Sequence, residues 1–316
     1  MHTANTLFEG VVVMFAIIFL AFFLKRMGIL KKDDSLLFSK IVLQITLPAV
    51  IFSSLAVQKF NKEFIVMAGI MAAVELGMIG LAWILGKILK LGRGEKGALI
   101  LVSAFGMTSM LGYPIISEVF NNSALAMEEA VITSEIGVGL LLFVLGPLIA
   151  MYYGDSHVEG KDIMQSVRSF FISPIFIALV AGLVVSILPV NEKSPVFAGA
   201  MRFFKLIGGA NLLMVALAIG LLLEMKHLKH AYIIVGIAIL LKLFMKPLLA
   251  FWLTGGAQFT EMMREIVLIE TALPSAILTA VFANHYKCRP DLVSLSIMTT
   301  LVLSLASMSL LFVFLF

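Results

Sequence analysis

Apolar stretches of about 20 residues, the length of helix that spans a bilayer, recur along nearly the whole chain. The polar segments between them are short. Hydrophobic residues make up 61% of the 316 residues and charged residues only 13%, whereas soluble domains average about 25% charged residues. This composition leaves too little polar surface for a soluble fold. We therefore predict an all-α integral membrane protein that crosses the bilayer many times.

The apolar windows predict ten transmembrane helices. They are placed at residues 7–24, 35–57, 64–86, 97–120, 127–151, 169–189, 196–223, 231–253, 263–283 and 291–316. No segment between them is long enough to fold as a soluble domain. Any binding site must therefore lie among the membrane-embedded helices.

Lys and Arg are concentrated in the loops that follow the odd-numbered spans. Positive loops favour the cytoplasmic side, so both termini are predicted to be extracytoplasmic, in the plasma or inner membrane. The net charge of +4 implies no nucleic-acid partner, because the basic residues are scattered over short loops and do not cluster on one domain.

Two prolines interrupt the apolar helices at related places in the sequence. Pro114 follows Gly112 and Tyr113 in the fourth predicted span, and Pro274 lies 160 residues later in the ninth. Proline lacks an N–H and clashes with the preceding turn, so each helix is expected to break there and leave a carbonyl free. In hydrocarbon that carbonyl needs a partner, and the N–H groups after each break suit a carboxylate.

The same offset relates most spans of the two halves. Residues 1–158 and residues 159–316 each hold five predicted spans, so the second half enters the membrane from the opposite side. Many secondary transporters have this inverted-repeat plan, with broken helices at the substrate site. We predict two inverted five-helix repeats with broken, crossing helices four and nine. An ordinary proline kink in each helix is the alternative.

Polar and helix-breaking residues of spans two, four, seven and nine form the predicted substrate site. It comprises Thr108, Ser109, Gly112, Tyr113, Pro114, Thr271, Pro274, Ser275, Pro48 and Asn211. For Asn211, a structural hydrogen bond between helices is the favoured alternative.

Ionisable residues at membrane depth are expensive to bury and indicate function. The candidate coupling residues are Glu75, Glu135, Lys242 and Glu270. Glu270 is the first candidate for proton coupling, because its own carbonyl is the one that Pro274 leaves unbonded. Glu75 and Lys242 lie in counterpart spans, and whether they pair is left open; such a pair would be either a structural ion pair or a coupling pair.

The sequence carries no signature of an enzyme or a metal centre. It has no His-Glu-x-x-His motif, no nucleophile elbow and no phosphate-binding loop, and its single cysteine, Cys288, excludes a multi-cysteine metal site. We expect no cofactor, so transport must use a proton, sodium or substrate gradient.

Four short motifs, in this order and spacing, resemble the auxin efflux carrier family of bacterial and plant secondary transporters. They lie at residues 47–52, 108–114, 173–175 and 272–276. The resemblance implies a fold like that of bile-acid and sodium/proton transporters, with a scaffold of spans 1, 2, 6 and 7 and a transport domain of spans 3–5 and 8–10. It also implies an elevator mechanism, with the lipid bilayer as environment and a small organic anion such as malonate, malate or auxin as substrate. A homodimer is left open.

The chain departs from the family at two places. Met107 stands where the family often has Asn, so the amide contact of that Asn is missing. Residues 152–168 are the entire counterpart of the long central loop of the plant carriers, which favours a bacterial-type carrier. Two alternatives stay open, a sodium/proton antiporter and a non-transporting receptor or scaffold. The antiporter normally needs intramembrane aspartates, and every Asp of this chain lies in a loop or at a span edge.

Overall fold

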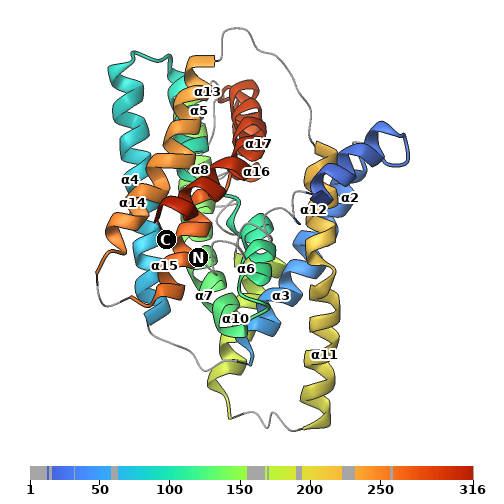
Figure 1. The fold of residues 1–316 in the computed structure, drawn as a ribbon. Helices are drawn as coiled ribbons and strands as arrows, with labels where there is room; N and C mark the ends of the chain where they lie inside the picture. The colour runs from blue at the N-terminus through green and yellow to red at the C-terminus, as the bar shows by residue number, and fades with distance from the viewer. Residues whose placement is uncertain are drawn as a thin grey trace. The chain divides into compact units, whose positions relative to one another are not determined.

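The computed structural model describes residues 13, 16–31, 33–57, 63–154, 168, 171–189, 194–222, 232–256 and 259–315. In this part of the chain every named element is a helix (Figure 1). Five helices among the described residues are long and apolar enough to cross a membrane: Leu37–Leu55, Glu63–Ile88, Ala124–Tyr153, Pro195–Ala218 and Tyr232–Leu253. The predicted all-α membrane protein is confirmed. The first predicted span lies partly outside the described residues, as does the predicted repeat boundary between residues 158 and 159.

The chain divides into two compact units, and the first contains Met1–Lys62, Ser109–Val131 and Phe171–Glu224. Its helices are α2 (Asp34–Ile41), α3 (Leu47–Leu55), α6 (Tyr113–Val119), most of α7 (Ala124–Ile132), α10 (Pro174–Ile187), α11 (Pro195–Gly209) and α12 (Asn211–Leu222). Helix α3 packs against α10 and α11, and α2 packs against α12. Gly182 allows α10 to approach α3 closely, because a Cβ there would lie 2.8 Å from the Cβ of Leu55.

The second unit contains Glu63–Thr108, Ile132–Phe170 and Met225–Phe316. Its α-helices are α4 (Glu63–Ile88), α5 (Arg93–Ala104), α8 (Leu140–Tyr153), α13 (Tyr232–Leu240), α14 (Lys246–Leu253), α15 (Glu261–Ala272), α16 (Ile277–His285) and α17 (Pro290–Leu315). Helix α4 packs against α5 and α14, which lie close to it in Figure 1.

Three π-helices precede prolines. They are η1 (Val42–Thr46), η2 (Thr108–Gly112) and η4 (Leu241–Met245), and they end two residues before Pro48, Pro114 and Pro247. A proline ring clashes with the carbonyl four residues earlier and offers no N–H. In a π-helix the N–H groups bond carbonyls five residues earlier; the N–H of Leu47, for example, donates to Val42 O. The wider turn thus accommodates each proline without ending the helix.

Pro114 therefore does not break its helix, and the predicted position of the first break is wrong. The break lies upstream, where α5 ends at Ala104 and extended backbone precedes η2 and α6. In the second half, Pro274 does lie in a break, because α15 ends at Ala272 and α16 begins at Ile277.

The extended backbone at these two breaks pairs within the second unit. Gly106 and Ser275 form an antiparallel bridge. The Met107 N–H donates to Pro274 O at 2.9 Å, and the Ala276 N–H donates to Phe105 O at 3.0 Å. Because unsatisfied backbone groups are costly in a membrane, each break supplies partners for the other.

We predict that Gly137→Ala destabilises the second unit. Gly137 lies in η3 (Thr133–Gly139), which packs against α4. A Cβ there would lie 2.8 Å from Ala68 O and 2.9 Å from Met71 Cβ. Such overpacking costs about 1–3 kcal/mol, so the melting temperature of the purified protein in detergent should fall.

Gly80→Ala is the matched control, because nothing lies within 4 Å of a Cβ built at Gly80 of α4. There alanine should be neutral or stabilising by up to about 1 kcal/mol. Equal melting temperatures for the two variants would contradict the close contact between α4 and η3.

Candidate functional site

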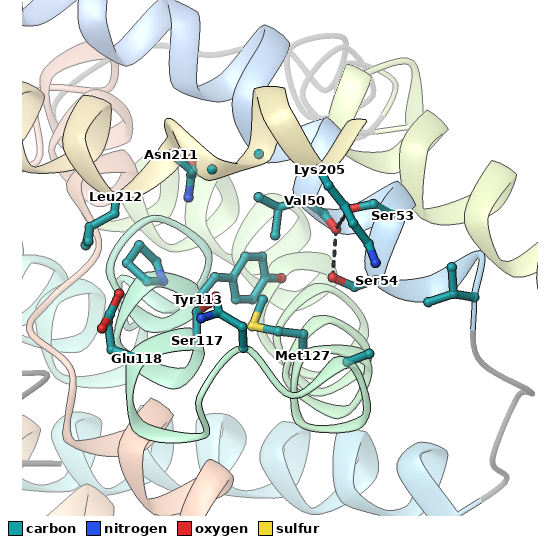
Figure 2. A pocket seen from close by; sticks show the side chains of 16 residues that line it. Val50, Ser53, Ser54, Tyr113, Ser117, Glu118, Met127, Lys205, Asn211 and Leu212 are labelled. Atoms are coloured by element: carbon teal, nitrogen blue, oxygen red, sulfur yellow. Dashed lines mark hydrogen bonds between the residues drawn. The ribbon is translucent and has the colours of Figure 1, made fainter. Parts of the chain in front are cut away.

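The first unit encloses a cavity of about 350 Å³. Its walls come from α3, α6, α7, α11 and α12 and from the residues next to them (Figure 2). The lining residues are Val50, Ser53, Ser54, Val57, Tyr113, Pro114, Ser117, Glu118, Asn122, Ala124, Met127, Lys205, Gly208, Gly209, Asn211 and Leu212. Clefts of about 300–1,000 Å³ are typical of small-molecule sites, so the cavity can hold a small metabolite.

Two of these walls are single faces of helices. The wall that begins at Val50 continues at residues 53, 54 and 57, and the wall that begins at Lys205 continues at residues 208, 209 and 212. Both follow the i, i+3, i+4, i+7 spacing of one helical face. Gly208 lets α11 approach α3, because a Cβ there would lie 3.0 Å from Val50 Cγ2. The close approach places Lys205 near the α3 serines.

Lys205 is the cation of this lining. It forms no ion pair with any residue that the structure describes. Figure 2 shows its side chain running beside Ser53 and Ser54. The Ser53 hydroxyl donates to Val50 O at 3.2 Å and the Ser54 hydroxyl donates to the same oxygen at 2.8 Å. Since both hydroxyl hydrogens are used within the helix, the lysine is the stronger partner for an anion here.

The side chain of Asn211 is oriented by a hydrogen bond from a residue that does not line the cavity. The hydroxyl of Thr46 in η1 donates to Asn211 Oδ1 at 2.8 Å. This bond satisfies the amide oxygen and leaves the amide NH₂ as a pair of donors, and Figure 2 shows the amide pointing into the cavity. Asn211 therefore makes a hydrogen bond to a neighbouring helix and also lines the cavity.

The cavity brings together Tyr113, Pro114 and Asn211 of the residues predicted for the substrate site. Pro48 lies in α3 but does not line the cavity. The N–H groups after Pro114 belong to a continuous helix, so the positive helix end predicted there is absent.

The remaining predicted site residues lie at or near the paired breaks, where their side chains are largely used by the protein. Thr108 accepts a hydrogen bond from the Ser134 hydroxyl at 2.6 Å. The Ser275 hydroxyl donates to Val102 O at 2.6 Å, and the Thr271 hydroxyl bonds carbonyls of its own helix. Ser109 and Gly112 lie in η2, and Pro274 contributes its carbonyl to the backbone pairing.

A buried charge cluster lies beside the breaks in the second unit. Lys246 Nζ lies 2.5 Å from Glu75 Oε1 and also donates to Ala104 O. Lys242 Nζ donates to Thr271 O at 3.3 Å. All three charged side chains are fully buried. The ion-pair partner of Glu75 is thus Lys246 and not Lys242, whose amino group binds Thr271 O instead.

The other two candidate coupling residues are buried in the same unit. Glu270 lies in the last turn of α15, and Glu135 lies in η3. The structure describes no group of three or more His, Cys, Asp or Glu that could hold a metal ion among the residues it covers.

Sequence reasoning missed Ser53, Ser54 and Lys205. The signal that could have found the lysine is the spacing of Lys205, Gly208 and Gly209 on one helical face immediately before Asn211.

The chain was compared with known proteins. Residues 6–312 match the family described as membrane transport protein. An uncharacterized transporter of Methanocaldococcus jannaschii is 26% identical over 301 residues, which cover 94% of this chain and 95% of the relative. An uncharacterized transporter of Methanothermobacter thermautotrophicus is 26% identical over 306 residues and covers 96% of both chains.

We predict that Lys246→Met strongly destabilises the protein. The substitution leaves the Glu75 carboxylate buried without its cation, and breaking a buried ion pair from one side costs about 3–5 kcal/mol. Thermal unfolding in detergent measures the effect. Lys205→Met is the control, because Lys205 is exposed and unpaired among the described residues.

The double variant Glu75→Leu with Lys246→Met removes both charges and should recover much of the loss. A wild-type melting temperature for Lys246→Met would show that the pair is not formed.

Proposed function

The chain belongs to the membrane transport protein family, which is the auxin efflux carrier family, and we propose that it is a secondary active transporter of a small organic anion. It is not an enzyme, and it acts in the membrane that its helices span. The observation that carries the proposal is Lys205, which forms no ion pair among the described residues and lines a cavity whose other walls are mostly neutral.

An unpaired cation beside neutral donors attracts a carboxylate. Lys205 supplies the charge, and the Asn211 amide at the start of α12 supplies hydrogen bonds. Charge-assisted hydrogen bonds to a carboxylate are about twice as strong as neutral ones. This combination supports binding of a carboxylate between α11 and the start of α12.

The rest of the lining favours a substrate with one carboxylate and an apolar body. Val50, Val57, Met127 and Leu212 supply apolar surface. Glu118 also lines the cavity, and it would repel a second carboxylate. Of the carboxylates and dicarboxylates expected from the family resemblance, we therefore propose a monocarboxylate.

The elevator mechanism is part of the proposal. The cavity is lined by α3, α11 and α12, from the predicted scaffold, and by α6 and α7, from the predicted transport domain. A substrate held between these two sets of helices would change its surroundings when one set moves. The paired breaks at residues 105–107 and 273–276 support the inverted repeat with crossing helices four and nine, which we propose as the architecture.

We predict that Lys205→Gln lowers uptake of a labelled monocarboxylate into proteoliposomes about 10- to 100-fold at limiting substrate. A hydrogen bond to a charged group contributes about 1.5–3 kcal/mol, which corresponds to such a factor. Lys205→Arg should retain most of the uptake, because it keeps the charge. Arg202→Gln is the matched control on the same helix, since Arg202 does not line the cavity. Equal losses for Arg202→Gln and Lys205→Gln, or no uptake of any carboxylate by wild type, would refute the proposal.

Proton coupling through Glu270 is the second part of the proposal, with Glu75 and Glu135 as the alternatives. Glu270→Gln cannot release or bind the coupled proton. Uptake driven by an imposed pH gradient should be lost, whereas exchange of labelled for unlabelled substrate at equal pH should persist. Gradient-driven uptake by the Glu270→Gln variant at the wild-type rate would exclude Glu270 as the proton carrier.

A further inference from the structure

At the C-terminal end of each interrupted helix of the second unit, a lysine side chain from another helix binds a backbone carbonyl. Lys246 Nζ donates to Ala104 O, in the last turn of α5, and Lys242 Nζ donates to Thr271 O, in the last turn of α15. The last four carbonyls of a helix have no partner within the helix and carry partial negative charge. In this protein a buried amino group binds one such carbonyl at each break.

Carbonyls at the C-terminal ends of half-helices are the ligands that coordinate the coupling cation in many secondary transporters. In this protein lysine amino groups already lie beside these carbonyls. A Cβ built on Gly106 would lie 3.1 Å from Lys242 Nζ, so the amino group reaches the paired backbone itself. Glu75 Oε1, a nearby carboxylate oxygen, is already bonded to Lys246.

The charge balance also opposes a bound cation. Lys246 forms an ion pair with Glu75, Lys242 lies in the same helical segment, and all three side chains are shielded from water. An added cation would replace an amino group or lie next to one, and repulsion between like charges is strong where the dielectric constant is low. Glu270, the acidic neighbour of Thr271, has its own interactions within the protein.

We propose that Lys242 and Lys246 take the place of a coupling sodium ion at the paired breaks, so that transport by this protein needs no sodium. This inference rests on the proposed function. It leaves proton coupling or uniport as the mode of transport, and it disfavours the sodium/proton antiporter as an alternative.

Thermal unfolding tests the inference without any substrate. The purified protein is melted in NaCl, KCl and choline chloride at equal ionic strength. A bound ion at concentration c stabilises the folded state by RT ln(1 + c/Kd), so the melting temperature keeps rising with the logarithm of the ion concentration. We expect the same melting temperature in all three salts. A rise that is specific to sodium and grows with the logarithm of its concentration would overturn the inference.

Uptake into proteoliposomes provides the second test. Replacement of sodium by choline on both sides should leave the initial rate unchanged, and an imposed sodium gradient should not accelerate it. A rate that falls severalfold in choline would overturn the inference. If no carboxylate is taken up in any medium, the proposed function fails, while the thermal measurement still decides whether sodium binds.

Lys242→Ala supplies the converse test. The variant frees the Thr271 carbonyl and leaves room for an ion, so it should acquire a sodium-specific rise in melting temperature that wild type lacks. A folded Lys242→Ala protein with no response to sodium would show that the lysine does not occupy a cation position. If the variant does not fold, the two wild-type measurements still decide.

Discussion

The backbone pairing between Gly106 and Ser275 is the interaction on which the second unit depends. Two helices stop inside an apolar environment. There each backbone group without a hydrogen-bond partner raises the free energy of the folded state by roughly several kcal/mol. Four residues exchange two hydrogen bonds across the breaks, and buried lysines bind the carbonyls Ala104 O and Thr271 O. The lysines in turn require Glu75, which forms the ion pair with Lys246. The hydrogen bonds between the two breaks, the lysine–carbonyl bonds at the helix ends and the Glu75–Lys246 ion pair therefore form one connected network.

The cavity of the first unit depends on a different constraint, the close approach of α11 to α3. Glycine at position 208 permits that approach. It brings a cation from one helix beside the serines of the other, and Thr46 orients the Asn211 amide towards the same space. The two units thus differ in how their buried or cavity-lining lysines are used: Lys205 of the first unit has no ion-pair partner among the described residues, whereas Lys242 and Lys246 of the second bind protein groups.

The sequence was sufficient to predict an all-α membrane protein, its family and the break at Pro274. It placed the other break wrongly, because proline was taken to end a helix. The wider turns of η1, η2 and η4 absorb Pro48, Pro114 and Pro247, and local sequence rules do not distinguish a break from a π-helix. The pairing of Glu75 with Lys246 was missed because two lysines, Lys242 and Lys246, lie one turn apart, and the sequence does not show which of them reaches the carboxylate. Lys205 was missed because only the packing of α11 on α3 makes it part of a cavity wall.

Protection from cysteine labelling tests the binding of an organic anion in the cavity most directly. Cys288 is the single cysteine of the chain and is buried, so Ser54→Cys in a Cys288→Ser background introduces one reactive thiol into the cavity wall. A charged thiol reagent should modify it, and a transported monocarboxylate should slow the modification saturably. With Lys205→Gln added, protection should require a much higher carboxylate concentration. A labelling rate that no transported carboxylate changes would contradict the account.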